Sequence, residues 1–519
     1  MRHPSMVFHP SNSALRIVVF FFVCVVATGA TAQVLSPFQY GLGEAEEGTD
    51  VYRALLHTHQ AADSCGGRVS YEGIDTLYLE IPPDARSIPL QRDNDFGGVV
   101  LIVSNSTKGF FLFSHKPEAA SIPVWDTLAV CRAIDSGDFR GIPSLGEGEW
   151  LLHVIDSTPW VDRREGYRYG HYREDIMTVR GGMSEDRPSM PYCEGGSHPS
   201  LFALRLDSIS SVPFSFGNIT FLRDSGSTCP TYLLDLEHLP QATLHDITVV
   251  TPHSEILAAN DAIIRVYNCT NVLIDRVILW GSYSRLNHSG YGIVLNNLRN
   301  THVRGLSSVS EWGIFGTNNM IETFIEHSDF NRFDIHCYGR DVAFEHCIQR
   351  NGYNQFSSVY GNISFHDCTF DNFIPVLIED SYNAYSHFLL NIDSCRWQPT
   401  AGRNTIFKGG RIDSHLNSRE ELQMPALPDI DINHLEIDAA KGVKKVTLYE
   451  LRGNERRAHV HSGVGRIHLH DITLSGNSKT RIILSTKRVK LLQGAKLEIN
   501  DDIPRQMTVL RKGALLRVN

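Results

Sequence analysis

An all-β solenoid, the right-handed parallel β-helix, is the fold that this sequence predicts, and three observations lead to it. Five apolar residues follow one another at a spacing of 21, namely Ile293, Ile314, Ile335, Phe356 and Leu377. The segments around them are short and rich in β-forming residues. Polar turn residues separate these segments, with no helical pattern between them. Self-similarity at one fixed period is typical of a stack of coils, each about 21 residues long.

A second row of residues marks the corners of the coils. Each member is polar, follows an apolar pair and precedes a small or apolar residue: Asn218, Asp246, Arg276, His327, His346, Asp367, Ser394 and Asp471. Asn, Asp and Ser suit a corner because their side chains can bond nearby backbone groups. The uneven spacing of this row indicates loop insertions in the longer coils, and in solenoids such insertions usually wall a binding face.

Residues 1–32 have the pattern of a secretory signal peptide. Arg2 and Arg16 precede the apolar run IVVFFFVCVVATGATA, in which the small residues Ala30 and Ala32 flank the expected cleavage point. The run is shorter than the ~20 apolar residues that a spanning helix needs. We therefore expect a secreted or periplasmic protein without membrane association after cleavage.

The rest of the chain divides into three stretches of one elongated domain. Residues 33–199 are predicted to form irregular β coils and a cap, residues 200–400 the β-helix core with the active face, and residues 401–519 further β coils. In the first stretch, VSYEGIDTLYLEIP and GVVLIVSNSTKGFFLFS have the pattern of strands. The segment RREGYRYGHYRED, residues 163–175, is predicted to be an exposed loop.

Composition excludes some partners and one kind of scaffold. The chain carries 48 basic and 58 acidic residues, a net charge of −10, so nucleic acid is not an expected partner and an anionic substrate would need a local basic patch. The ten cysteines show no CxxC pair and do not indicate a zinc site or a small disulfide scaffold. Cys347, Cys368 and Cys395 occupy equivalent positions in successive coils, and we expect them to stack inside.

Polar residues with acid/base chemistry gather on the opposite side of the predicted strands from the core. If Ile314, Ile335 and Phe356 point inward, their neighbours point outward, because strand side chains alternate. Phe315 would then face outward, and so would the five residues of one patch on coils ~4.8 Å apart, which are Arg332, Asp334, His336, Tyr353 and Gln355. We expect a ring of further residues around this patch: Trp312, Asn318, Tyr338, Arg340 and Arg350. A cation, a carboxylate, an imidazole and a phenol together can form an acid/base site.

The coil pattern resembles the pectate-lyase-like superfamily of right-handed β-helices, mainly over residues 200–400. The strings WGIFGTNN, RFDIHCYGRD and YNQFSS resemble those of secreted bacterial β-helix proteins that degrade polysaccharides. This resemblance implies a lyase or a glycosidase acting on long glycans. The clustered aspartates with a nearby arginine of calcium-dependent pectate lyases have no counterpart here, so no cofactor is expected and calcium is unsupported.

The leading hypothesis is a polysaccharide lyase that cleaves an acidic, uronate-containing polysaccharide by β-elimination. His336 is the expected base, because its ordinary pKa lies near the operating pH, and Tyr353 the expected acid. Asp334 would orient the imidazole. Arg332, Arg340 or Gln355 would neutralise the substrate carboxylate. The several arginines favour a glycosaminoglycan such as chondroitin or dermatan sulfate over pectin.

Two alternatives remain open. A glycoside hydrolase would use two carboxylates, for which Asp334, Glu311, Glu379 and Asp380 are candidates. A non-catalytic glycan-binding solenoid would instead use aromatic and basic side chains such as those of RREGYRYGHYR as contacts. A lyase product carries a conjugated double bond that absorbs ultraviolet light, whereas a hydrolase product does not and a binder makes none.

Overall fold

The computed structural model describes one compact unit, residues 33–519, apart from several gaps. The gaps are residues 105–109, 159–171, 194–196, 207–212, 224–230, 252–261, 281–290, 310–314, 337, 358, 381–387, 413–426, 453–458, 462, 478–479, 488, 492, 495, 502–508 and 513–519. The predicted signal peptide, residues 1–32, lies outside the described residues. No helix in the described part of the chain is both long and apolar enough to cross a membrane.

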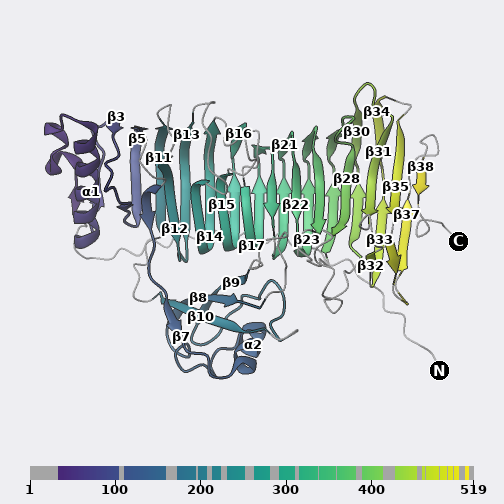
Figure 1. Cartoon of the computed structure of the whole chain (residues 1–519), viewed down its shortest axis with the longest axis horizontal. Coiled ribbons are helices and arrows are strands. Elements are labelled where there is room, and N and C mark those ends of the chain that lie inside the picture. The colour runs from purple at the N-terminus through teal and green to yellow at the C-terminus, as the bar shows by residue number, and fades with distance from the viewer. Residues whose placement is uncertain are drawn as a thin grey trace. The chain divides into compact units, whose positions relative to one another are not determined.

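The unit is a right-handed parallel β-helix, as the sequence predicts, built on a 30-stranded sheet. Figure 1 shows its strands side by side from β3 to β38. Each coil contributes to three ladders, which we call sheets A, B and C. Sheet A contains β4 (Ile88–Pro89), β6 (Phe110–His115), β12 (Thr231–Glu237), the first parts of β14 (Ala262–Trp280), β15 (Tyr291–Arg304) and β17 (Phe315–Glu326), then β19 (Phe333–Ile335), β22 (Tyr353–Phe356), β25 (Ile374–Asp380), β28 (Thr405–Ile412), β31 (Lys445–Arg452), β35 (Arg481–Lys487) and β38 (Val509–Lys512).

Sheets C and B follow sheet A along each coil. Sheet C contains the first parts of β5 (Asp93–Val103), β11 (Phe214–Arg223) and β13 (Ala242–Val250), later parts of β14, β15 and β17, then β20 (Gly339–Glu345), β23 (Val359–His366), β26 (Phe388–Asp393), β29 (Asp429–Asn433), β33 (Val464–Leu469) and β37 (Lys496–Asp501). Sheet B contains β3 (Thr76–Leu79), the ends of β5, β11, β13 and β14, then β16 (Ser307–Val309), β18 (Asp329–Phe330), β21 (Ile348–Arg350), β24 (Thr369–Asp371), β27 (Arg396–Gln398), β30 (Glu436–Ala439) and β34 (Thr473–Gly476). Two short parallel pairs complete the strands: β1 (Val34–Leu35) with β2 (Arg68–Val69), and β32 (His459–His461) with β36 (Val489–Leu491).

The corner between sheets C and B confirms the second row of the sequence pattern. All eight predicted corner residues have positive φ: Asn218, Asp246, Arg276, His327, His346, Asp367, Ser394 and Asp471. Gly305 and His434 occupy the same corner in two further coils. A left-handed residue lets the strand change direction in a single step, which is why short polar residues are favoured there.

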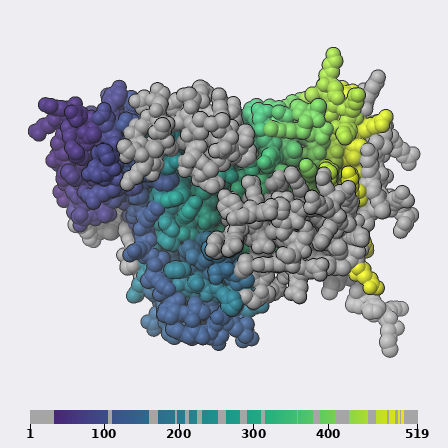
Figure 2. Space-filling view, in the orientation of Figure 1, coloured from purple at the N-terminus to yellow at the C-terminus, as the bar shows by residue number. Residues whose placement is uncertain are grey.

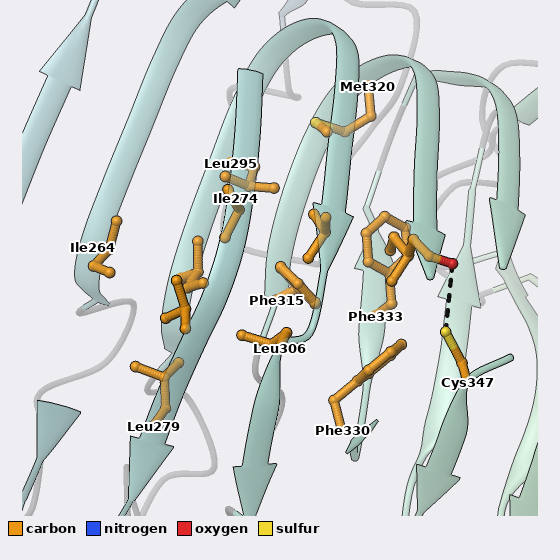
Figure 3. Close-up of a cluster of buried hydrophobic side chains, with 14 of the residues drawn as sticks. Ile264, Ile274, Leu279, Leu295, Leu306, Phe315, Met320, Phe330, Phe333 and Cys347 are labelled. Carbon is orange, nitrogen blue, oxygen red and sulfur yellow. Dashed lines mark hydrogen bonds between the residues drawn. The ribbon is translucent and has the colours of Figure 1, made fainter. Parts of the chain in front are cut away.

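The interior is one continuous apolar core, part of which Figure 3 shows around Phe315, Phe330 and Phe333. Phe315 is fully buried, so the prediction that it faces outward is wrong. The predicted stack of cysteines is confirmed, since Cys347, Cys368 and Cys395 are buried and none is in a disulfide.

The fixed spacing of 21 holds for one step of the predicted register and fails for its neighbours. Ile335 pairs with Phe356, as predicted. Ile293, however, pairs with Phe315, and Ile335 pairs with Thr317. Likewise Phe356 pairs with Ile378, because the register shifts within β25, so Leu377 lies opposite Gln355. The coil from Ile293 to Phe315 has 22 residues and the coil from Thr317 to Ile335 has 18, and a strict period cannot follow such changes in coil length.

Helices α1 (Gly48–Cys65), η1 (Pro37–Tyr40) and η2 (Leu42–Glu44) lie at the first end of the stack, where α1 packs on β2, β3 and β4. Inside this cap His59 is buried between Gln91, 3.0 Å from Nδ1, and the Tyr71 hydroxyl, 2.7 Å from Nε2. Burial lowers the pKa of His59 to about 4, so the ring is neutral near pH 7.

A small subdomain is inserted between β6 and β11. It consists of α2 (Thr127–Ser136) and an antiparallel sheet in the order β7 (Ala120–Ile122), β10 (Pro199–Arg205), β8 (Glu149–Asp156) and β9 (Arg173–Arg180), around its own apolar core. Figure 2 shows its blue surface next to the teal surface of the middle coils. The exposed loop predicted for residues 163–175 is wrong at its end, because β9 begins at Arg173. The Arg173 side chain is fully buried in an ion pair with Asp156 at 2.8 Å. Residues 163–171 lie outside the described residues.

Candidate active site

The candidate site is centred on Asp334, in the middle of β19 on sheet A. Its neighbours Phe333 and Ile335 are in the core, so Asp334 lies on the other face of the strand. There it pairs with Gly316 of β17 on one side and with Gln355 of β22 on the other. The sequence predicted a solvent-facing patch, and this part of the prediction is wrong, because the Asp334 side chain is 0% exposed.

Three side chains surround the Asp334 carboxylate. Arg332 Nε donates to Oδ1. The His336 Nε2 atom lies 3.3 Å from Oδ2. The Tyr291 hydroxyl donates to the same oxygen over 3.4 Å. A buried carboxylate is stable only when it is paired and hydrogen-bonded, and these contacts meet that need.

Arg332 joins the carboxylate to the next coil. Its side chain is 6% exposed, its Nη2 donates to Gln355 Oε1 over 3.0 Å, and its guanidinium lies 4.5 Å from the centre of the Tyr353 ring. Burial by itself lowers the pKa of Arg332. The Asp334 carboxylate and the neighbouring tyrosines together raise this pKa by more than burial lowers it, so the net shift is upward. The guanidinium therefore stays charged inside the cluster.

Tyr291 is a member of the site that the sequence analysis missed. It begins β15, two coils before β19 and next to β17, and its ring covers Gly316. A Cβ atom at Gly316 would lie 2.9 Å from that ring, so only glycine leaves room for the phenol to reach Asp334. A glycine inside a strand often marks such a close approach, and this signal could have pointed to Tyr291.

His336 is the most exposed of the residues that contact the carboxylate, with a side chain that is 14% accessible against 6% for Arg332. Its backbone N–H donates to the Thr317 carbonyl over 3.0 Å, which fixes it beside β17. The Asp334 carboxylate lies 3.3 Å from Nε2, so it faces that nitrogen and leaves Nδ1 as the nitrogen on the other side of the ring. Asp334 and His336 thus have the geometry of an oriented base.

The structure brings together five of the predicted residues and adds Tyr291. We call this set the Asp334 cluster: Tyr291, Arg332, Asp334, His336, Tyr353 and Gln355. Asn318 lies beside it on β17, next to the Thr317 carbonyl that accepts from His336. Trp312 and Glu311 lie outside the described residues. Glu379 and Asp380 end β25, and their side chains also lie outside the described part.

Three residues predicted to ring the patch lie elsewhere. Arg350 ends β21 on sheet B, where it bonds Asp329 at 2.8 Å. Arg340 is on β20 of sheet C, and its Nη1 donates to the Pro188 carbonyl of the subdomain over 3.4 Å. Tyr338 is buried at the corner before β20, with a φ of 60°. The prediction was wrong for these three because a corner separates them from the strand that carries the site.

The Asp334 cluster combines an oriented imidazole, a charged guanidinium and two phenols from β15, β19 and β22 of one sheet, with β17 between the first two strands. Groups of these types can move a proton and stabilise a developing negative charge. Among the residues that the structure describes, no group of three or more His, Cys, Asp or Glu side chains is arranged to hold a metal ion. The fold and site together define a parallel β-helix with a polar acid/base cluster on sheet A.

Comparison with solved structures finds proteins that are similar in fold but have low sequence identity to this chain. No protein family matches the chain, and no curated protein sequence does. The tailspike protein gp49 of Pseudomonas phage LKA1 is similar over 93% of this chain and 83% of its own, with 14% identity and a TM-score of 0.49. The Gp54 tailspike of Acinetobacter baumannii bacteriophage AP22, solved with a capsular saccharide, is similar over 89% of this chain and 79% of its own, with 12% identity and a TM-score of 0.46. An exopolygalacturonase from Thermotoga maritima is similar over 94% of this chain and 93% of its own, with 11% identity and a TM-score of 0.30. At these values the likeness says nothing of what this chain binds or cleaves.

Proposed function

We propose that this protein is a secreted polysaccharide lyase that cleaves a uronate-containing chain by β-elimination at the Asp334 cluster. The observation that carries the proposal is the contact between a buried, ion-paired carboxylate and a partly accessible imidazole, with a guanidinium and two phenols beside them. This set matches the needs of proton removal next to a carboxylate, followed by protonation of a leaving oxygen.

In the proposed reaction His336 removes the proton from the sugar carbon next to the carboxylate. The electron pair of that C–H bond forms the new double bond, and the bond to the neighbouring glycosidic oxygen breaks. A phenol, Tyr353 or Tyr291, gives its proton to the departing oxygen. Asp334 holds the imidazole in place, and the fixed charge of Arg332 stabilises the negative charge that develops on the substrate carboxylate.

The positions of two arginines remove the reason for preferring one class of uronate polymer. A sulfated glycosaminoglycan was favoured over pectin because several arginines were expected around the site. Arg340 and Arg350 lie on sheets C and B, so that reason no longer applies. We propose a uronate polymer without a preference between the two. The hydrolase alternative has less support, since the Asp334 carboxylate is 0% exposed and is occupied by the bond from Arg332, which keeps it from contacting a sugar directly.

The test is the initial rate of ultraviolet-absorbing product over a panel of uronate polymers, with the parent protein and three variants. His336→Ala is expected to lower turnover by about 10²-fold or more, the usual effect of removing a positioned base. Asp334→Asn should lower it less, because the imidazole remains. His327→Ala, which removes an exposed corner histidine, is the matched control and should retain the parental rate.

Three results would count against this proposal. A folded His336→Ala protein with parental turnover would remove His336 from the mechanism. Reducing ends released without ultraviolet absorbance would indicate a hydrolase. Binding of the polymer without any product would indicate a glycan-binding solenoid.

A further inference from the structure

A second group of charged and aromatic side chains lies on the same face of sheet A, nearer the N-terminus. It consists of Lys116, Asp235, Glu237, Arg265 and Tyr267, and we call it the Asp235 cluster. Asp235 lies between the core residues Leu234 and Leu236 of β12, so its side chain points away from the core. Arg265 is its direct neighbour on β14.

Two cations converge on the single carboxylate of Asp235. Arg265 donates to it through Nε over 2.7 Å and also through Nη2, and Lys116 Nζ forms an ion pair with it. The carboxylate is only 5% exposed, whereas the side chains of Lys116 and Arg265 are 38% and 32% exposed. A guanidinium has five N–H donors and an ammonium three, so donors remain for a ligand beyond those that Asp235 takes.

Flat aromatic surfaces flank these cations. The Arg265 guanidinium lies 4.6 Å from the centre of the Phe111 ring and 5.2 Å from that of Tyr267. Such stacking holds the guanidinium plane in place while its edge stays available for bonding. Glu237 occupies the next outward position on β12, where it accepts from Asn268 over 3.0 Å and can accept from a sugar hydroxyl.

The strand register connects the two clusters. Asp235 pairs with Arg265, Arg265 with Val294, Val294 with Gly316, and Gly316 with Asp334. Four strand steps of ~4.8 Å place the two carboxylate-bearing positions about 19 Å apart along the stack. Several linked sugar rings span that distance, and one ring does not.

The next outward row also joins the clusters. Tyr267 pairs with Asn296, and Asn296 pairs with Asn318, which lies beside His336. Both asparagine side chains are partly exposed. A row of phenol, amide, amide and imidazole therefore runs across successive coils between the Asp235 cluster and the Asp334 cluster.

We infer that the Asp235 cluster is a binding subsite for an acidic sugar of the same glycan chain whose reacting sugar occupies the Asp334 cluster. Lys116 and Arg265 bind the sugar carboxylate, and Tyr267 bonds a hydroxyl. The intervening sugars lie over Asn296 and Asn318. The inference rests on the proposed function for the place of the reacting sugar, but binding at Lys116 does not depend on catalysis.

The test is a comparison of long and short ligands on the His336→Ala protein, using calorimetry with an octasaccharide and a disaccharide of the uronate polymer that the protein binds best. Lys116→Gln is expected to weaken octasaccharide binding by about 10-fold, the usual effect of losing a hydrogen bond to a charged group, and to leave the disaccharide bound at the Asp334 cluster unaffected. Tyr267→Phe should weaken the octasaccharide by about fivefold. Arg265 is not substituted, because it makes both side-chain hydrogen bonds to the buried Asp235 carboxylate, whereas Lys116 makes one ion pair with it and is more exposed.

Lys496→Gln is the matched control, since it removes one exposed charge of the same sign from sheet C. It should change neither affinity. Parental octasaccharide binding by Lys116→Gln, an equal loss for both ligands, or no binding of any uronate octasaccharide would overturn the subsite. If Lys116→Gln weakens octasaccharide binding but the parent protein makes no ultraviolet-absorbing product, the subsite is supported and the lyase is refuted. If Lys116→Gln binds the octasaccharide unchanged and the parent protein does make such product, only the subsite is refuted.

Discussion

Two Arg–Asp assemblies on neighbouring sheets use the same residue types in different surroundings. On sheet A, Arg332 and Asp334 are 6% and 0% exposed and share Gln355, Tyr353, His336 and Tyr291. On sheet B, Arg350 lies between Asp329 and Asp371, and all three side chains are about two-fifths exposed. The first assembly is buried and closely packed, and the second is an exposed ladder. The difference shows that residue type and spacing do not by themselves define a site, since burial decides what a charge contributes.

The sharpest way to break this comparison is to remove the buried carboxylate. Asp334→Ala would leave the Arg332 guanidinium buried with no carboxylate, which costs ~3–5 kcal/mol of unfolding free energy. Urea unfolding followed by circular dichroism measures this loss. If Asp334→Ala were as stable as Asp329→Ala, the two assemblies would be energetically equivalent and the distinction would fail.

His59 extends the comparison of buried and exposed groups to the N-terminal cap, where its imidazole ring is buried. Because burial lowers the pKa of His59 to about 4, the unfolded chain, with an ordinary histidine pKa near 6.5, takes up a proton that the folded cap does not. The contribution of His59 to the unfolding free energy should therefore be fully present above pH 6.5. It should fall by about 3 kcal/mol as the pH drops to 4.

The measurement for His59 is the unfolding free energy of the parent and of His59→Gln at both ends of that range. The gap between the two proteins should narrow on acidification, with exposed His327→Gln as the control. An identical pH dependence in parent and His59→Gln would show that His59 does not contribute to this loss.

Steric crowding in the Asp334 cluster should have a smaller effect. Gly316→Ala would place a Cβ atom 2.9 Å from the Tyr291 ring and push the phenol away from Asp334, at a cost of about 1–3 kcal/mol. Gly402→Ala is the control, because no atom lies within 4 Å of the added carbon. Equal thermal stability of the two variants would contradict the close packing described here.

The smallest effect is expected on the solvated ladder. Arg350→Gln should change the unfolding free energy by less than ~1 kcal/mol, and 1 M salt should reduce even that, because exposed pairs are screened. Arg332→Gln in the same salt series is the comparison, and its larger cost should persist. A cost for Arg350→Gln that equals that of Arg332→Gln would place the ladder in the same class as the buried assembly.

The sequence predicts the coils and their corners well because each depends on local chemistry. Asn218 or Asp367 can be recognised as a corner from its own side chain and two neighbours. The residues Arg332, Asp334 and His336 could likewise be placed together with Tyr353 and Gln355, since they are close in sequence or one period apart.

The rest of the site depends on insertions and on which sheet a strand joins. The coil from Gly316 to Asp334 has 18 residues instead of 21, so the residue opposite Asp334 could not be identified as Gly316, and Tyr291 was missed with it. Arg350 follows Asp329 by the same 21 residues that separate Arg332 from Tyr353. Periodicity therefore cannot distinguish the exposed ladder from the buried cluster. The antiparallel subdomain has no counterpart in the repeat at all.

The single-residue corner between sheets C and B has an evolutionary consequence. Asn218, Asp246 and Asp367 each turn the chain in one step, and among the described corners of this edge only that of β5 is longer, with three residues opposite Asn218. The chain between sheets B and A, and that between sheets A and C, is where residues 251–261, residues 381–387 and the subdomain are inserted. Both of those edges border sheet A. Insertions and deletions can therefore remodel the surroundings of the glycan face, and so change specificity, while the C–B edge keeps the coils in register.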